Sequence, residues 1–221
     1  MKEYFGEGTL GDTYIITLKA MALGTESIKI KHLTKHTYWH REIREIYSIS
    51  PNIEVEFVDK KHTDLIELTT DCHEQEMVFF PEFNIVNGYT ANREYIVIQP
   101  HAGKDKGEGN NKEINVSSVI TAVNQLKESN IVILGTKEKY KEVQAPNVIN
   151  LINKTNILAA IAVTANAKEF IGPEGLLAFV SLSQKKKSNV FYASREAVER
   201  RIIGTPWEEY CNFVEARKDE K

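Results

Sequence analysis

The alternation of apolar and polar residues in the first half of the chain predicts short strands separated by amphipathic helices. Period-two alternation predicts three strands, at 2–5, 27–33 and 53–58. Apolar residues at helical spacing predict helices at 13–22 and 38–49. Such a strand-helix order is typical of a parallel sheet with crossover helices. Residues 70–92 follow no period, and we expect irregular chain there that leads to the second half.

The second half repeats this order of elements. Strands are expected at 95–99, 131–134, 148–151, 169–171 and 190–192. Helices are expected at 114–128, 157–164, 174–182 and 206–216. We therefore expect an α/β protein of two Rossmann-like lobes with parallel sheets, the N-terminal lobe being reduced. The expected units are a first lobe at 1–92, a second at 93–205, and a C-terminal helix within 206–221 that packs back across the body.

Composition changes this picture little. The 221 residues are 42% hydrophobic and 27% charged, as in ordinary soluble proteins. No apolar run approaches the roughly 18–20 residues that span a bilayer, and residues 1–4 lack the apolar stretch of a signal peptide. We expect a cytoplasmic protein without a transmembrane segment.

The cysteines and histidines predict no metal site. Cys72 and Cys211 make neither a disulfide framework nor a Cys-x-x-Cys pair. His32, His36 and His40 recur every four residues, but the first precedes the expected helix. We expect a solvated surface there rather than a ring of ligands.

Charge is distributed unevenly along the chain. Residues 1–94 carry 10 Lys and Arg against 16 Asp and Glu, whereas residues 95–221 carry 18 against 15. This asymmetry suits an anionic ligand held mainly by the second lobe, although random surface scatter explains it equally well. No basic stripe with interleaved aromatic residues occurs, so nucleic acid is not an expected partner.

Two glycine-centred turns carry the candidate chemistry. Residues 8–12 (GTLGD) and 171–175 (IGPEG) each join an expected strand to an expected helix, where free N–H groups bind anions. We expect one turn in each lobe, with a ligand cleft between them. Asp12 at the helix entry is either an N-terminal cap or a general base facing this cleft. Pro173 is expected in the first turn of its helix, where a missing N–H costs little.

Two further strands of the second half end in polar turns. Pro100-His101-Ala102-Gly103 leads into the loop 104–112 (KDKGEGNNK), and Gly135-Thr136-Lys137-Glu138 is expected to start another helix. Open α/β sheets place ligands where strands end in such loops. His101 is either a side chain of the cleft or a turn histidine with an ordinary structural role.

These motifs, taken in order, resemble the nucleotide-sugar-binding domain of GT-B glycosyltransferases, in particular the heptosyltransferase-like members of glycosyltransferase family 9. The resemblance rests on segments 97–103, 133–138, 147–156 and 170–175, and on Leu10-Gly11-Asp12, and it covers most of the chain. It implies transfer of a sugar from a nucleotide-diphosphate sugar to the hydroxyl of a saccharide or lipid-linked saccharide. It also implies that no metal or other cofactor is needed, because helix N-termini and cationic side chains stabilise the leaving diphosphate.

The resemblance assigns roles to particular residues. Asp12 matches the general base. Glu138 matches the acid that accepts the ribose hydroxyls, and Lys104 or Lys106 corresponds to the loop lysine that neutralises the diphosphate. The remaining donor-binding residues that it implies are Gly11, His101, Gly103, Gly135, Gly172, Pro173, Glu174 and Gly175.

The sequence also departs from the family pattern. The family has an acidic residue two places before the second glycine of the turn and a histidine three places after it, where this chain has Pro173 and Ala178. These departures leave open a non-catalytic GT-B-like binding or assembly module. A short first lobe could also expose apolar surface that a second copy would cover in a homo-oligomer.

Overall fold

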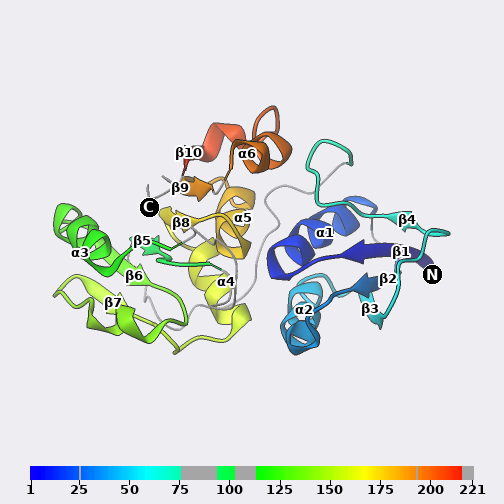
Figure 1. Cartoon of the computed structure of the whole chain (residues 1–221), viewed down its shortest axis with the longest axis horizontal. Helices are drawn as coiled ribbons and strands as arrows, with labels where there is room; N and C mark the ends of the chain where they lie inside the picture. Colours follow the sequence, from blue (N-terminus) through cyan, green and yellow to red (C-terminus); the bar gives the residue numbers. More distant parts are fainter. Residues whose placement is uncertain (25, 76–93, 103–112, 193, 216–221) are drawn as a thin grey trace, which may run out of the picture.

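The computed structural model describes residues 1–24, 26–75, 94–102, 113–192 and 194–215. Two lobes lie side by side, each built on its own parallel sheet (Figure 1). The expected boundary between residues 92 and 93 lies outside the described residues. Two α/β lobes with parallel strands are the architecture predicted from the sequence.

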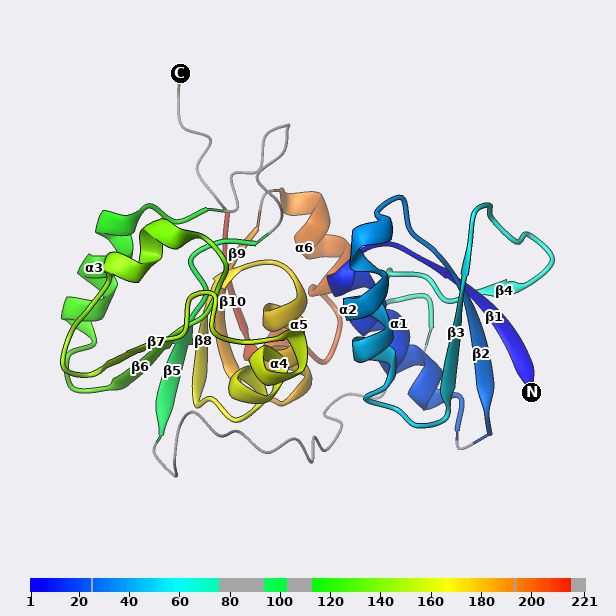
Figure 2. The ribbon, with the colours of Figure 1, turned by 90° about the horizontal axis from the view of Figure 1, so that it is seen from below.

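The first lobe contains a four-stranded sheet in the order β3-β2-β1-β4. Its elements are β1 (Lys2–Glu7), α1 (Leu10–Ala22), β2 (Ile28–Leu33), the 3₁₀ turn η1 (Thr37–Trp39), α2 (His40–Tyr47), β3 (Ile53–Val58) and β4 (Ile66–Glu67). The strand order advances in one direction from β1 to β3, so right-handed crossovers put α1 and α2 on the same face. Figure 2 shows both helices on the side that faces the second lobe.

The opposite face of this sheet is charged. Lys29 and Lys31 of β2 alternate with buried isoleucines, and they pair with Glu56 of β3 (2.6 Å) and Glu3 of β1 (3.1 Å). Parallel sheets usually need cover on both faces. Among the described residues of this lobe, a ladder of ion pairs lies on this face in place of a second layer of helices.

The second lobe contains a six-stranded sheet in the order β10-β9-β8-β5-β6-β7. Its strands are β5 (Tyr95–Ile98), β6 (Asn130–Ile133), β7 (Val148–Asn150), β8 (Glu169–Pro173), β9 (Lys187–Tyr192) and β10 (Cys211–Glu215). Its helices are α3 (Val116–Gln125), α4 (Ile157–Ala165), α5 (Leu176–Ser183) and α6 (Arg195–Arg201), with 3₁₀ turns η2 (Glu138–Glu142) and η3 (Glu208–Tyr210). The chain runs outward from β5 to β7, returns through α4, and then runs the other way from β8 to β10. The strand order therefore reverses between β5 and β8.

Three expectations about the second lobe are wrong. In the described part of the chain, the segment after residue 206 is not a long helix; it forms β10, which pairs with β9 and extends the sheet. The last strand is therefore β10 and not β9. Pro173 ends β8 instead of starting a helix. The turn at Gly135 leads into the single short 3₁₀ segment η2 rather than an α-helix.

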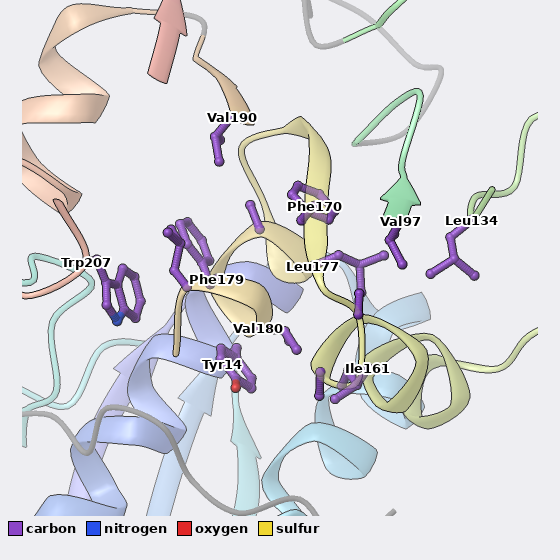
Figure 3. Packing of buried hydrophobic residues seen from close by; sticks show 14 of the residues in the cluster. Tyr14, Val97, Leu134, Ile161, Phe170, Leu177, Phe179, Val180, Val190 and Trp207 are labelled. Atoms are coloured by element: carbon purple, nitrogen blue, oxygen red, sulfur yellow. The ribbon is translucent and has the colours of Figure 1, made fainter. Parts of the chain in front are cut away.

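The largest hydrophobic core crosses the junction between the lobes. Tyr14 of α1 packs with Phe179 and Val180 of α5, and the cluster continues through Ile161 of α4 to the sheet of the second lobe (Figure 3). The Tyr14 hydroxyl hydrogen-bonds the Ser183 hydroxyl at 2.7 Å in the buried interior. Continuous apolar burial is the main stabilising term in such an interface, so the lobes are held in one arrangement.

Candidate functional site between the lobes

A cavity of about 670 Å³ opens where strands of the first lobe end. Glu7, Leu33 and Glu67, the last residues of β1, β2 and β4, line it together with the segments that follow those strands. Arg200 and Arg201 of α6 line it from the second lobe. Ligands of open α/β sheets bind at the carboxyl ends of the strands, and this cavity has that position.

Asp12 lies in the wall of this cavity and caps α1. Its Oδ2 accepts hydrogen bonds from the backbone N–H of Thr9 (2.9 Å) and from the Thr9 hydroxyl (3.2 Å). The arrangement is a capping box, in which the third helical residue bonds back to the N-cap. The capping role considered for Asp12 is therefore present, and it leaves the carboxylate at the cavity wall.

Arg201 connects Asp12 to the second glycine turn. Its Nη2 donates to Asp12 Oδ1 at 2.9 Å, and its Nη1 donates to Glu174 Oε1 at 2.6 Å. The Arg201 guanidinium lies 5.2 Å from the ring centre of Phe179, and its side chain is 11% exposed. A single arginine of α6 thus joins one carboxylate from each glycine turn.

His32 is buried and contacts the backbone of the first glycine turn. Its Nδ1 lies 2.8 Å from the Tyr47 hydroxyl and its Nε2 lies 3.3 Å from the Gly8 carbonyl oxygen. Because a carbonyl only accepts, Nε2 carries the proton and Nδ1 accepts from Tyr47. Burial lowers the pKa of His32 to about 4, against smaller opposing contributions from the Gly8 carbonyl and Asp12. The expectation of a solvated histidine is wrong for His32.

Lys19 fixes another wall of the cavity. This lysine is buried in α1, and its Nζ donates to the Thr69 and Asp71 carbonyl oxygens, both at 2.6 Å. The cavity-lining segment after β4 is therefore held by backbone contacts as well as by its own turns. A polar wall built this way is formed before a ligand arrives.

The second glycine turn lies at the reversal point of its sheet. β5 and β8 are neighbours there, and their carboxyl ends lead to His101 and to Gly175. A Cβ on Gly175 would lie 3.5 Å from the Ala102 Cβ, so the two turns are adjacent. Gly175 is the N-cap of α5 with φ +153°, a conformation open to glycine alone at low cost. Such reversal points are where doubly wound folds bind ligands.

Gly172 has a different role. A Cβ there would lie 2.7 Å from the Gln99 carbonyl oxygen and 2.8 Å from the Phe170 ring. Residue 172 must therefore lack a side chain so that β8 can pack against the chain that follows β5. Packing alone therefore explains why residue 172 is a glycine.

His101 is buried beside Gly135 and Tyr140. Its Nε2 lies 3.4 Å from the Thr136 hydroxyl, and its ring stacks on the Tyr140 ring at 6.3 Å between centres. A β-bridge pairs His101 with Glu113. A Cβ on Gly135 would lie 3.5 Å from the His101 Nδ1. The two turns that were expected to bind the donor thus pack against each other.

Glu138 is exposed at the start of η2. Its carboxylate accepts a hydrogen bond from Asn153 at 2.5 Å and pairs with Lys141 at 2.6 Å. Both contacts lower the pKa of Glu138, and the one with Lys141 contributes most. The carboxylate is therefore ionised at neutral pH and acts as a hydrogen-bond acceptor only.

Three of the predicted donor residues, Gly103, Lys104 and Lys106, lie outside the described residues. Within the described ranges, no group of three or more His, Cys, Asp or Glu side chains has the arrangement of a metal site. None of the described helices is both long and apolar enough to cross a bilayer.

Comparison with solved structures identifies the architecture. The heptosyltransferase II of Escherichia coli, described as an ADP-heptose lipopolysaccharide heptosyltransferase, aligns with a TM-score of 0.62 at 13% identity over 97% of this chain and 90% of its own. A family 9 glycosyltransferase from Veillonella parvula aligns with a TM-score of 0.62 at 11% identity over 97% and 86%. The E. coli heptosyltransferase WaaC with ADP aligns with a TM-score of 0.59 at 10% identity over 98% and 94%. The chain has the heptosyltransferase-like GT-B fold.

At sequence identities of 10–13%, the structural similarity establishes the fold alone. No protein-family model matches the sequence, and no curated protein is significantly similar to it. Ala178, where the sequence resemblance leads one to expect a histidine, is fully buried in the core that crosses the junction between the lobes. Pro173 is buried at the end of β8. Pro173 at the end of β8 and Ala178 in α5 are therefore used for packing.

Arg201, which joins the two glycine turns of this GT-B fold, was not among the residues predicted from the sequence. A signal for it does exist. Val198 lies three positions before Arg201 in α6 and is buried, so a cation at position 201 falls on the apolar face of this helix. A cation on such a face needs a buried partner, although the sequence does not reveal which carboxylate that is.

Proposed function

We propose that this protein transfers a sugar from a nucleotide-diphosphate sugar to an acceptor hydroxyl, with Asp12 as the general base. One observation carries the proposal: Asp12 lies in the wall of the inter-lobe cavity and is joined through Arg201 to Glu174, directly before the N-cap of α5. The heptosyltransferase-like GT-B fold supports it, since structures of that fold include one solved with ADP. Donor and acceptor would then meet at the junction of the two lobes.

The proposed donor site is the reversal point between β5 and β8. The free N–H groups at the start of α5 would face the diphosphate, and the Glu138 carboxylate would accept hydrogen bonds from the ribose. The lysines at 104 and 106 would add positive charge. This set of groups provides charge stabilisation for the leaving diphosphate without a metal ion.

The proposed acceptor site is the cavity of the first lobe. Asp12 would take the proton of the acceptor hydroxyl while that oxygen attacks the anomeric carbon. The bond from this carbon to the diphosphate oxygen would break at the same time and release the nucleoside diphosphate. Arg201 holds one oxygen of Asp12 and thereby fixes the orientation of the carboxylate.

A non-catalytic binding module is the second candidate, and the surroundings of Asp12 favour it. Both carboxylate oxygens already accept hydrogen bonds, from Thr9 and from Arg201. The buried Ala178 also lacks any group that could contact a donor. On this alternative the nucleotide pocket is kept and transfer is lost.

The test is transfer of radiolabelled sugar from a panel of nucleotide sugars to saccharides and glycolipids, comparing Asp12→Asn with Asp64→Asn. The first substitution keeps the size of the side chain and an acceptor oxygen for Arg201, whereas Asp64 is exposed in a loop. We expect transfer to fall at least a hundredfold in Asp12→Asn alone, with donor binding retained. Equal transfer by both variants would refute the role of Asp12, and donor binding without transfer by the native protein would support the binding module.

A further inference from the structure

We infer that the inter-lobe cavity binds a hydroxyl-rich saccharide that carries no phosphate or carboxylate group. The inference rests on the proposed function, because it names the class of acceptor for the cavity that Asp12 faces. Its basis is the charge of the cavity wall, the hydrogen-bonding groups on it, and an aromatic segment that continues from it.

The wall of the cavity carries more negative than positive groups. Five carboxylates line it, from Glu7, Asp12, Glu67, Asp71 and Glu74, against the cations of Lys35, Arg200 and Arg201. Arg201 pairs with Asp12 and with Glu174, which lies outside the lining, and Glu67 pairs with Lys61 at 2.6 Å. The lining charges outside these pairs are three carboxylates against two cations, so the balance is slightly negative and favours a ligand without negative charge.

The same groups suit the hydroxyls of a sugar. An ionised carboxylate only accepts hydrogen bonds, and it offers about four acceptor positions to neighbouring O–H groups. Threonine hydroxyls add groups that both donate and accept, and those lining the cavity are Thr9, Thr34, Thr69 and Thr70. Hydrogen bonds to charged acceptors are stronger than those between neutral groups, so a ligand with many hydroxyls gains most here.

An aromatic segment extends from the cavity wall along η1. His36 lines the cavity, its ring centre lies 5.2 Å from that of Tyr38, and Tyr38 lies 5.3 Å from Trp39. Tyr38 is 49% exposed. Flat aromatic faces beside a few convergent polar groups are the usual composition of a site for a small organic ligand. The apolar face of a sugar ring can pack on the half-exposed Tyr38 ring, which lies beside the cavity-lining His36.

The test is binding to an array of saccharides in four classes: neutral, amine-bearing, carboxylated and phosphorylated. We expect neutral and amine-bearing glycans to be retained and the two anionic classes to be excluded. The double variant Glu7→Gln, Glu74→Gln should weaken that binding at least tenfold. The matched control Glu54→Gln changes an exposed glutamate of β3, which does not line the cavity, and should leave binding unchanged.

Stronger binding to phosphorylated or carboxylated glycans would overturn the inference, and so would the absence of binding to every class. Titration of the same preparation with nucleoside diphosphates reports on the proposed function separately. If the protein binds a nucleotide but no neutral glycan, only the inference about the acceptor is refuted. If it binds neutral glycans but no nucleotide, the proposed transferase function is refuted and the saccharide site remains.

Discussion

Gly11 of α1 lies directly against Phe179 of α5, so that a Cβ on Gly11 would be 3.2 Å from the Phe179 ring. The same Cβ would be 3.3 Å from the backbone nitrogen of Leu176, in the first turn of α5. The two glycine turns, one from each lobe, are therefore in contact.

This contact predicts that Gly11→Leu destabilises the protein. The larger side chain has to displace the Phe179 ring and the backbone of α5, and such overpacking costs about 1–3 kcal/mol. The free energy of unfolding, measured with urea, should fall by this amount. Asn124→Leu also introduces a leucine, but at an exposed position of α3, and should change stability by less than about 0.5 kcal/mol. Equal stability of both variants would show that the helices can separate at no cost.

Replacing Arg201 should be far more damaging than replacing a neighbouring arginine. Arg201→Met removes the ion pair with the Glu174 carboxylate, which is 5% exposed, and breaking such a buried pair costs about 3–5 kcal/mol. Arg195 is 58% exposed on the same helix, where it pairs with the exposed Glu199 and lies 5.5 Å from the ring centre of Phe213. Its change to Met should cost less than about 1 kcal/mol. Thermal unfolding of the two variants checks this. A small effect of Arg201→Met would mean that the lobes are not joined through this side chain.

His32 predicts a loss of stability in mild acid. Its pKa is lowered to about 4 by burial, whereas an unfolded histidine titrates near 6.5. Between these two pH values the unfolded chain binds the extra proton, so the contribution is complete above pH 6.5 and is lost as the pH falls toward 4. The loss amounts to roughly 3 kcal/mol over that range.

Urea unfolding at pH 7 and pH 5 measures the effect of His32. In His32→Gln the free energy of unfolding should differ less between pH 7 and pH 5 than it does in the native protein, although this variant is less stable at pH 7. His36→Gln, at an exposed position, should keep the native slope. If the unfolding free energy of His32→Gln depends on pH as strongly as that of the native protein, another group causes the acid sensitivity.

The strands β1, β2 and β3 of the first lobe were predictable because their sheet has one solvated face, whereas the two-residue β4 was not predicted. Lys29 and Lys31 alternate with Ile28 and Ile30, and this period of two can only be a strand. The strand at Ile53–Val58 was predicted with the same bounds for the same reason. The turns that end in Asp12 and Gly175 were visible because glycine is required there.

The prediction for the C-terminal segment was wrong because its spacing is ambiguous. Trp207, Tyr210, Phe213 and Val214 are compatible with a helix, but Trp207 is fully buried, with its ring stacked 5.7 Å from that of Phe179. The residues after it add an edge strand to the sheet. Short apolar segments are the case in which periodicity does not separate helix from strand.

The centre of the candidate site could not be predicted from local sequence. Asp12 and Arg201 are 189 positions apart, and only the packing of α1 against α5 and α6 brings them together. The same holds for the cavity, whose wall is made from three strand ends of one lobe and a helix of the other. Local patterns predicted which turns matter, and the tertiary structure decided what each turn contacts.

The central claim is a nucleotide-diphosphate site at the start of α5, and isothermal titration without metal tests it most directly. ADP, UDP, GDP, CDP and dTDP would be titrated into the native protein, Glu138→Gln and the matched control Glu142→Gln, both positions being exposed in η2. We predict saturable binding of at least one nucleotide by the native protein and the control, and weaker binding by Glu138→Gln. Absence of binding for every nucleotide, in a sample shown to be folded, would contradict the claim.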